Sequence, residues 1–191
     1  MMGARHGRGG GSRAEWLNPD KILKVVGVSG GMVVADLGCG PGYFSVPMAS
    51  MVGKEGLVYA VDSDPLALDR LREGAESNPE GERGTIRIVQ SDVTSTGIPN
   101  GSVDIAFFAN VLHDITDKAA FLCEVKRILK PSGTAVDVDW RRAPMEVGPP
   151  FEMRLDEASV TEILWDNGFG VARTLDVGPF HYGLAAVRRP P

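Results

Sequence analysis

The sequence predicts an α/β fold in which a doubly wound parallel sheet lies between two layers of helices. Short runs rich in apolar and β-branched residues recur along the chain, helical patterns lie between them, and glycine-rich turns separate the two. Several runs are almost continuously apolar, which is typical of strands buried on both faces. A chain of 191 residues has the length of one domain. We therefore expect a single three-layer domain over residues 16–191 after a flexible, Arg- and Gly-rich tail over residues 1–15.

The expected elements alternate in chain order. Strands are expected at residues 32–37, 57–62, 85–90, 103–108 and 134–140, and two closing strands at about 170–177 and 181–188. Helices are expected after Asn18-Pro19, over 41–51, after Asp64-Pro65, from Thr116 or Asp117 to Pro131, and from Asp156 to Gly168. Turn residues dominate 92–102 and 141–155, so both are expected to be irregular, the second of them placed where a loop can cover a site.

Charge and composition exclude several classes of protein. The net charge is −5; residues 1–24 hold five Lys or Arg against two Asp or Glu, and Arg188 and Arg189 add two more cations, so the remaining body is near −10. Such a body repels a phosphate backbone, and we expect no nucleic-acid partner. No apolar run is long enough to span a membrane. Two cysteines, outside any metal-binding pattern, favour a cytoplasmic location and no metal site.

A glycine-rich segment follows the first expected strand. It reads Asp36-Leu-Gly-Cys-Gly-Pro-Gly42, with glycines at alternate positions. Such spacing lets the chain turn tightly and lets a ligand lie against bare backbone near a helix N-terminus. A dinucleotide fingerprint would need glycine where Tyr43 stands. The segment therefore predicts a nucleotide-like ligand other than a dinucleotide.

Two further carboxylates end the next two strands. Asp62 is placed to accept hydrogen bonds from both hydroxyls of a ribose, and Asp92 from an exocyclic amine such as that of adenine. Taken singly, each acid has an equally good interpretation as a turn residue or helix cap. Their succession along one sheet edge, beside the glycines, favours a shared ligand site.

The strings VVADLGCGPGYFSVPMA, VYAVDSDPLAL, VQSDV, IPNGSVDIAFFANVLHDI and LKPSGT together resemble the class I S-adenosylmethionine-dependent methyltransferases, in particular the quinone-biosynthesis-like, type 11 branch. The resemblance covers roughly residues 16–189. It implies a Rossmann-like sheet of seven strands with the last strand antiparallel, and S-adenosyl-L-methionine as cofactor. It also implies a cofactor-binding set: Asp36, Gly38, Gly40 and Gly42 around the methionine moiety, Asp62 and Ser63 at the ribose, Asp92 and Val93 at the adenine, and Asn110 at the methionine end.

Methyl transfer needs the acceptor held in line with the sulfonium, about 3 to 3.5 Å from the methyl, so a base matters only for a protonated or weak nucleophile. His113 and Asp139, after the fourth and fifth strands, are the candidate catalytic residues. The alternative is that His113 lines the pocket or has a structural role. Asp137, on the same strand face as Asp139, is either paired in the core or directed into the site.

The expected function is methyl transfer to an unidentified acceptor. A small molecule is favoured, and a protein side chain is the alternative acceptor. A non-catalytic cofactor-binding partner subunit and a nucleotide-cofactor oxidoreductase remain as other functions. Only the N-terminal helix and the 141–155 loop are available as a lid, which argues against a large lipophilic quinone. The sequence leaves the oligomeric state open.

Overall fold

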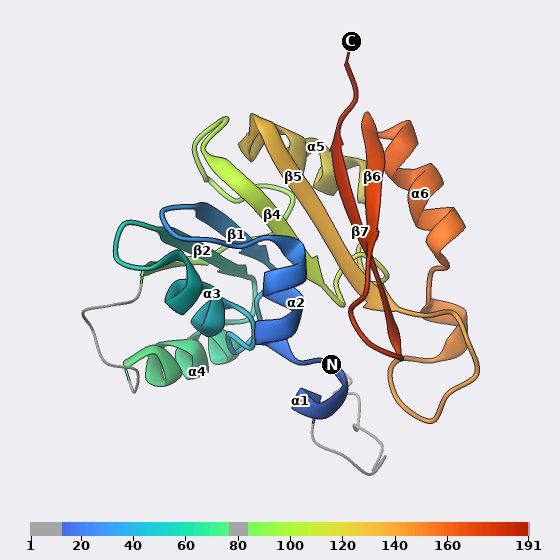
Figure 1. The fold of residues 1–191 in the computed structure, drawn as a ribbon, viewed down its shortest axis with the longest axis horizontal. Coiled ribbons are helices and arrows are strands. Elements are labelled where there is room, and N and C mark those ends of the chain that lie inside the picture. Colours follow the sequence, from blue (N-terminus) through green and yellow to red (C-terminus); the bar gives the residue numbers. More distant parts are fainter. Residues whose placement is uncertain (1–12, 77–83, 191) are drawn as a thin grey trace.

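The computed structural model describes residues 13–76 and 84–190, which form a seven-stranded sheet with helices on both faces (Figure 1). The spatial order of the strands is β3-β2-β1-β4-β5-β7-β6. The last strand in the chain, β7, is antiparallel to both of its neighbours, and the remaining pairings are parallel. The strands are β1 (Val33–Leu37), β2 (Leu57–Asp62), β3 (Thr85–Gln90), β4 (Val103–Ala109), β5 (Leu129–Trp140), β6 (Phe169–Leu175) and β7 (His181–Arg188).

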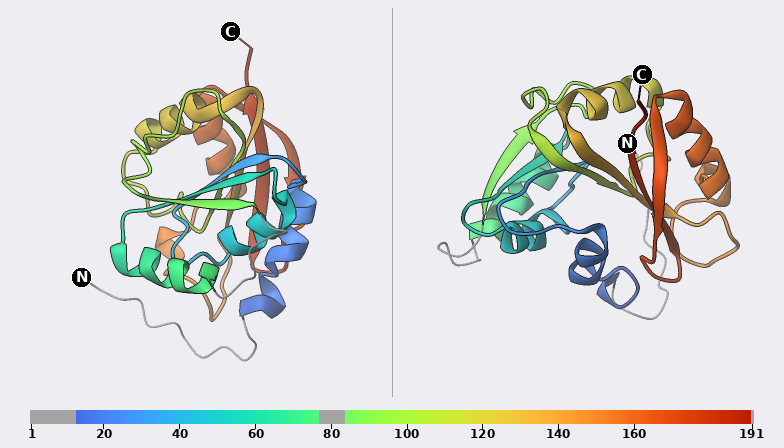
Figure 2. Two further views of the ribbon diagram at one scale, coloured as in Figure 1. Left: turned by 90° about the vertical axis from the view of Figure 1, so that its left-hand side faces the viewer. Right: turned by 45° about the horizontal axis from the view of Figure 1, so that its top comes forward.

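The strand order reverses between β1 and β4, since the chain runs outward from β1 to β3 and then returns to β4 on the other side of β1. At such a switch point the loops on either side diverge and leave a crevice outside the carboxyl ends of the strands. We call this edge of the sheet, which carries the ends of β1 to β5 and the start of β7, the carboxyl edge. Figure 2 gives two further views of this arrangement.

Most helices begin at the caps that the sequence predicts. The Asn18 side chain accepts a hydrogen bond from Lys21 N (3.0 Å), Asp117 caps α5 through Ala120 N (2.9 Å), and Asp156 caps α6 through Ser159 N (2.8 Å). The helices are α1 (Arg13–Trp16), α2 (Pro19–Val26), α3 (Ser45–Val52), α4 (Pro65–Glu76), α5 (Lys118–Ile128) and α6 (Glu157–Asp166), with a short 3-10 helix η1 (Phe151–Met153).

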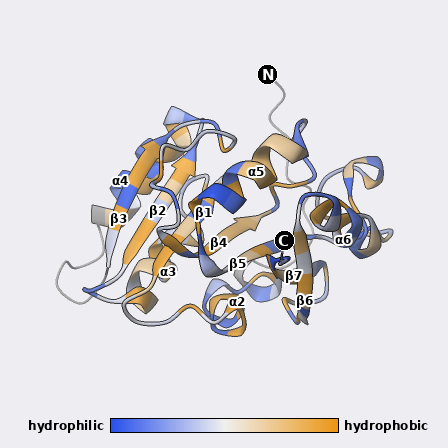
Figure 3. Ribbon diagram, turned by 90° about the horizontal axis from the view of Figure 1, so that it is seen from above, coloured by the Kyte–Doolittle hydropathy of each residue, from blue (hydrophilic) through white to orange (hydrophobic). Residues whose placement is uncertain are grey.

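Two apolar layers sandwich the sheet. On one face α2 and α3 pack on strand residues such as Val34, Val58 and Ile105, and α4 packs on the same face at Ala60. On the other face α5 and α6 pack on the alternate residues, among them Ala35. Figure 3 shows apolar colouring along the strands between these layers. This is the three-layer, doubly wound architecture that the sequence predicts.

Several boundaries differ from the sequence-based expectation. The strand expected at 134–140 begins at Leu129, because Leu129 already pairs with Val103 and the irregularity between Val103 and Ile105 absorbs the Pro-Ser-Gly turn. For the same reason α5 ends at Ile128 and not at Pro131. The helix expected over 41–51 begins only at Ser45 after a run of turns, and the strand expected at about 170–177 spans Phe169–Leu175.

Residues 1–12 of the expected flexible tail lie outside the described residues, and residues 13–15 belong to α1. Segment 92–102 forms turns and extended chain, as expected for a connection too short for a crossover helix. Within residues 13–76 and 84–190, no helix is long and apolar enough to cross a membrane.

Candidate active site

The glycine loop, residues 38–42, turns at the carboxyl end of β1. Gly38, Gly40 and Gly42 all have positive φ, at 73°, 52° and 86°. A Cβ at Gly38 would lie 2.6 Å from Val111 Cγ2, and one at Gly42 would lie 2.2 Å from Leu71 Cδ1, whereas a Cβ at Gly40 would meet nothing within 4 Å. The outer two glycines therefore let neighbouring side chains pack on the loop, and Gly40 leaves open space at which a ligand can approach the backbone.

Asp62, at the end of β2, fastens the glycine loop to the next loop. One oxygen, Oδ2, accepts a hydrogen bond from Gly40 N (2.7 Å), and Oδ1 accepts one from Asp64 N (2.9 Å). A carboxylate has about four acceptor positions, so the half-buried Asp62 retains capacity for hydroxyl donors. Ser63, beside it, is exposed. The arrangement is compatible with the ribose contact expected of Asp62 and adds a loop-holding role that the sequence pattern did not indicate.

Asp36 lies beneath the glycine loop instead of at its open side. Its side chain is 2% exposed and accepts a 2.5 Å hydrogen bond from the hydroxyl of Ser45, the first residue of α3. Burial, with a further contribution from the charge of Asp62, raises the pKa of Asp36 to about 7 although the Ser45 hydrogen bond lowers it. Asp36 thus supports the loop from below and is poised near neutrality between its charged and neutral forms.

Asp92, after β3, is exposed and holds the start of the next loop. Its Oδ1 accepts hydrogen bonds from Thr94 N (2.8 Å) and Thr94 Oγ1 (2.6 Å), and these bonds lower its pKa. Val93 packs against the apolar cluster under α5. Farther along, buried Glu124 on α5 accepts hydrogen bonds from Thr96 N and Oγ1 and holds this loop to the helix. Asp62 and Asp92 therefore follow adjacent strands at one edge, as the sequence predicts.

Asn110 follows β4 and is adjacent to the glycine loop. Its φ of 59° is the one positive value outside glycine in the part of the chain that the structure describes. Its N–H continues the β4–β5 ladder by donating to Val138 O (2.8 Å), and the next residue, Val111, packs on Gly38. The fourth strand and the glycine loop therefore meet at Asn110, on the acceptor side of the switch point.

His113 and Asp139 form a side-chain pair across the ends of β4 and β5. His113 Nδ1 lies 2.8 Å from Asp139 Oδ1 and 3.0 Å from Oδ2, and His113 N also donates to Oδ2 (3.3 Å). Asp139 is 1% exposed and the His113 side chain 5%. Because a carboxylate accepts at Nδ1, the proton of neutral His113 is on Nδ1 and Nε2 carries a lone pair.

The surroundings of His113 raise its pKa. Burial lowers it, but the hydrogen bond to Asp139, the charge of Asp139 and the charge of Asp114 together outweigh burial. Asp114 Oδ1 is 3.5 Å from His113 Nε2. Asp139, which is 26 positions away in sequence but in direct contact, thus orients the imidazole. Asp114, the next residue in sequence, stabilises the protonated ring.

Asp137 is buried at 1% exposure in the strand interior, two residues before Asp139 on the same face. Burial, reinforced by the charge of Asp139, holds the pKa of Asp137 well above its usual range, and the neighbouring Tyr182 hydroxyl counteracts this. No hydrogen bond of ordinary geometry reaches the Asp137 oxygens among the described residues. Of the two interpretations that the sequence left open, the structure supports the core one, since Asp137 is buried in the strand interior beside Tyr182.

The 141–155 loop is fastened from within. The guanidinium of buried Arg154 donates to the carbonyl oxygens of Ala143 (2.9 Å), Val147 (2.8 Å) and Pro149 (2.9 Å), and it lies 5.9 Å from the centre of the Trp140 ring. Sequence reasoning did not single out Arg154, since nothing local distinguishes it from Arg141 or Arg142. The loop expected to serve as a lid is therefore folded around a buried cation.

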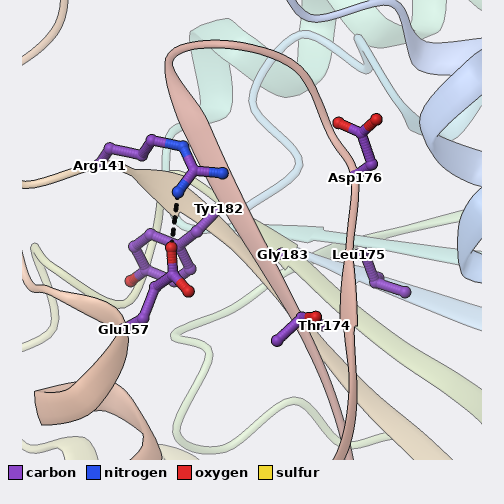
Figure 4. A pocket seen from close by; sticks show the side chains of 7 residues that line it. All are labelled: Arg141, Glu157, Thr174, Leu175, Asp176, Tyr182 and Gly183. Carbon is purple, nitrogen blue, oxygen red and sulfur yellow. Dashed lines mark hydrogen bonds and ion pairs between the residues drawn. The ribbon is translucent and has the colours of Figure 1, made fainter.

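A polar pocket of about 300 Å³ lies beyond β5 at the same edge (Figure 4). Arg141 and Glu157 face each other across one wall, with N–O 2.6 Å, and Asp176 stands on the opposite wall. Tyr182, which pairs with Asp139 in the β5–β7 ladder, separates this pocket from the His113–Asp139 pair. No group of three or more His, Cys, Asp or Glu in the described ranges is arranged to hold a metal ion.

Comparison with known proteins gives consistent matches. A family model described as a methyltransferase domain matches residues 35–136. The structure of a SAM-dependent methyltransferase from Aquifex aeolicus superposes with a TM-score of 0.85 at 32% identity over 92% of each chain. The structure of a type 11 methyltransferase from Sulfolobus solfataricus gives 0.69 at 32% identity, over 83% of this chain and 85% of that one.

Among curated proteins, the ubiquinone/menaquinone biosynthesis C-methyltransferase of Marinomonas sp. is 28% identical over 63% of this chain and 47% of its own length. The match thus spans about half the length of this relative. It spans 34% of a transposon protein of Streptomyces fradiae, to which the chain is 30% identical. The residues that the family model matches include the glycine loop and the ends of β1 to β4.

Proposed function

Since the chain belongs to the methyltransferase domain family, we propose that it transfers a methyl group from S-adenosylmethionine to a small-molecule acceptor at the carboxyl edge. The observation that carries the proposal is the joint geometry of Gly40 and Asp62. Gly40 presents open backbone, and Asp62 holds its N–H while keeping acceptor capacity for a ribose. The His113–Asp139 pair lies at the same edge across the switch point.

The cofactor-binding residues are those expected from the sequence. The glycine loop and the carbonyl of Asn110 contact the methionine part, Asp62 and Ser63 bind the ribose, and Asp92 and Val93 flank the adenine. Asp36 contributes from beneath the loop, through Ser45.

When bound, S-adenosylmethionine supplies an electrophilic methyl group on a positively charged sulfur. His113 Nε2 takes the proton that the acceptor atom loses as that atom forms its bond to the methyl, and Asp139 stabilises the resulting imidazolium through Nδ1. The bound cofactor would also supply the leaving group, a thioether that carries no charge once the methyl has been transferred. A raised His113 pKa favours this proton transfer but requires that the pH exceed that pKa for the base to be free.

The acceptor class follows from this chemistry. A base beside the reacting atom fits an acceptor with a proton to lose, such as a phenol, an enol or a thiol. The quinone-biosynthesis names of the curated relatives support an acceptor with a quinone-like ring. Because the 141–155 loop is held by Arg154 and offers limited cover, a compact acceptor fits better than a long lipophilic one.

The test has two parts. Calorimetry with S-adenosylhomocysteine and with NADH separates the proposal from a nucleotide-cofactor oxidoreductase: we expect binding of the first, and binding of NADH alone would refute the proposal. Transfer of labelled methyl from S-adenosylmethionine to a panel of phenols, thiols, amines and protein side chains then identifies the acceptor. Labelling that appears only when a second protein is added would favour a partner subunit, and labelling of protein alone would favour the side-chain alternative.

A further inference from the structure

Asn110 is held in a backbone conformation that residues with a Cβ rarely adopt. Left-handed backbone is disfavoured for L-residues, and Asn tolerates it better than most. The Asn110 N–H donates to Val138 O, and Val111, the next residue, lies against Gly38, so the Asn110 carbonyl is the backbone group that the proposed function assigns to the cofactor. Strained positions persist only where their surroundings hold them, and they gather at ligand sites.

The residue that holds the Asn110 side chain is His181, at the start of β7. His181 is fully buried, and its Nε2 lies 3.0 Å from Asn110 Oδ1, to which it donates in the tautomer with the proton on Nε2. The two residues are 71 positions apart in the chain. The contact thus joins the antiparallel closing strand to the turn after β4.

Two tryptophans fix the plane of the His181 ring. Trp16, at the end of α1, stacks on it with ring centres 5.7 Å apart and planes 8° apart. Trp140 pairs with His181 in the β5–β7 ladder, with ring centres 4.2 Å apart. The adjacent Leu17 carbonyl accepts a hydrogen bond from the Tyr43 hydroxyl (2.6 Å), which ties this N-terminal segment to the residue after the glycine loop. The ring therefore has little freedom to release Asn110.

We propose that His181 is a positioning residue for the methionine end of the cofactor site, acting through the Asn110 side chain to hold the Asn110 carbonyl in its left-handed conformation. The inference rests on the proposed function, because it assigns the Asn110 carbonyl to the cofactor. His181 does not contact the cofactor itself. A buried ring packed against two tryptophans that also contact each other suits this role, since it can fix an amide without moving when ligand enters.

A double-mutant cycle on S-adenosylhomocysteine binding, measured by calorimetry, tests this. His181→Phe keeps a ring packed against Trp16 and Trp140 but removes the hydrogen bond, and we expect affinity to fall about 3- to 10-fold, as for loss of one hydrogen bond. His181→Gln, which places an amide donor near the position of Nε2, should recover part of the loss. In Asn110→Gly, glycine adopts the left-handed backbone conformation without a side-chain hydrogen bond from residue 181. Adding His181→Phe to that variant should therefore cause no further loss of affinity.

The outcomes separate the inference from the function on which it rests. If wild-type protein does not bind S-adenosylhomocysteine, the proposed function fails. If wild type binds and His181→Phe binds equally well, or loses the same factor in the Asn110→Gly background, the positioning role is wrong and His181 serves packing alone. Thermal unfolding of each variant without ligand shows whether the variant is folded. If His181→Phe is not folded, the cycle uses His181→Gln in its place. An equal loss of affinity from His181→Gln in the wild-type and Asn110→Gly backgrounds would again overturn the positioning role.

Discussion

The loops after β1, β2 and β3 are held mainly by carboxylates that accept hydrogen bonds from backbone N–H groups, whereas the segments after β4 and β5 are held by contacts between two side chains. Asp62 binds Gly40 N and Asp64 N. Across the switch point, Asp139 reaches His113 over 26 positions and His181 reaches Asn110 over 71. We call the first set of loops the cofactor half and the second the acceptor half.

This difference matches the two tasks. A cofactor of fixed shape can be bound by a short local motif of glycines and strand-end carboxylates. An acceptor must be placed against a reactive methyl with a base at the correct distance, and the base must itself be oriented by a second residue. Substitutions in the cofactor half, and those of Asn110 and its partner His181, should therefore change cofactor affinity, whereas those of His113 and Asp139 should change turnover.

The largest effect is expected at His113. His113→Ala should lower methyl transfer, to the acceptor that the labelling assay identifies, by about 10²- to 10⁴-fold, because a positioned base contributes that much. S-adenosylhomocysteine affinity should stay within about twofold, because His113 belongs to the acceptor half. Asp139→Asn should reproduce most of the loss, since it removes the charge that raises the pKa of His113.

The pH profile provides the control for this prediction. In wild type, turnover should rise with pH through a pKa above the usual value for histidine, and Asp139→Asn should shift that rise to lower pH. A profile without such a rise, or a His113→Ala enzyme as active as wild type, would leave His113 with the pocket-lining role.

Asp36 gives a pH-dependent effect on folding. Its pKa is about 7 in the folded state against a reference of 3.8, so below pH 4 it is protonated in both states and has no cost. As the pH rises from about 4 to 7 the unfolded state ionises first, and stability falls by an amount on the order of 4 kcal/mol at most. Asp36→Asn should remove this loss, so its stability advantage over wild type should grow between pH 4 and pH 8.

Chemical denaturation at several pH values measures this difference. Asp69→Asn, on the exposed surface of α4, is the matched control and should follow the wild-type curve. If the free energy of unfolding changes with pH equally in wild type and in Asp36→Asn, Asp36 ionises normally and its burial beneath the loop is misassigned.

Asp62→Ala should weaken S-adenosylhomocysteine binding by about 1.5 to 3 kcal/mol, the typical value for hydrogen bonds to a charged group. The variant loses both the ribose acceptor and the anchor of Gly40 N. Asp69→Ala serves as the reference in calorimetry. Unchanged affinity in a folded Asp62→Ala protein would contradict the ribose role.

The smallest effect is expected at Gly40, which we compare with Gly31, a glycine in a similar local backbone conformation. Gly40 and Gly31 have positive φ, and a Cβ at either meets nothing within 4 Å. Alanine at each should cost about 1 to 2 kcal/mol of stability from backbone strain. Only Gly40→Ala should also weaken S-adenosylhomocysteine binding, because only its open space belongs to the cofactor half. If both variants bind alike, the space above Gly40 is not the ligand site.

The cofactor half was largely predictable from the sequence, and the acceptor half was not. Gly38, Gly40 and Gly42 with Asp62 and Asp92 stand at fixed offsets from apolar runs, so strand periodicity places them on one edge. The sequence pattern offered His113 and Asp139 as separate candidates, but their contact depends on the β4–β5 register. His181, Arg154 and the burial of Asp36 depend on tertiary packing, for which no local pattern in the sequence exists.

Amide hydrogen exchange of the protein with and without S-adenosylhomocysteine tests the division of the carboxyl edge most directly. We expect added protection in the glycine loop, residues 61–64 and 91–95, and around Asn110, with little change in the 141–155 loop, which Arg154 already holds. Protection confined to the 141–155 loop and the Arg141–Glu157 pocket, with the glycine loop unchanged, would contradict the assignment of the cofactor to the loops after β1, β2 and β3.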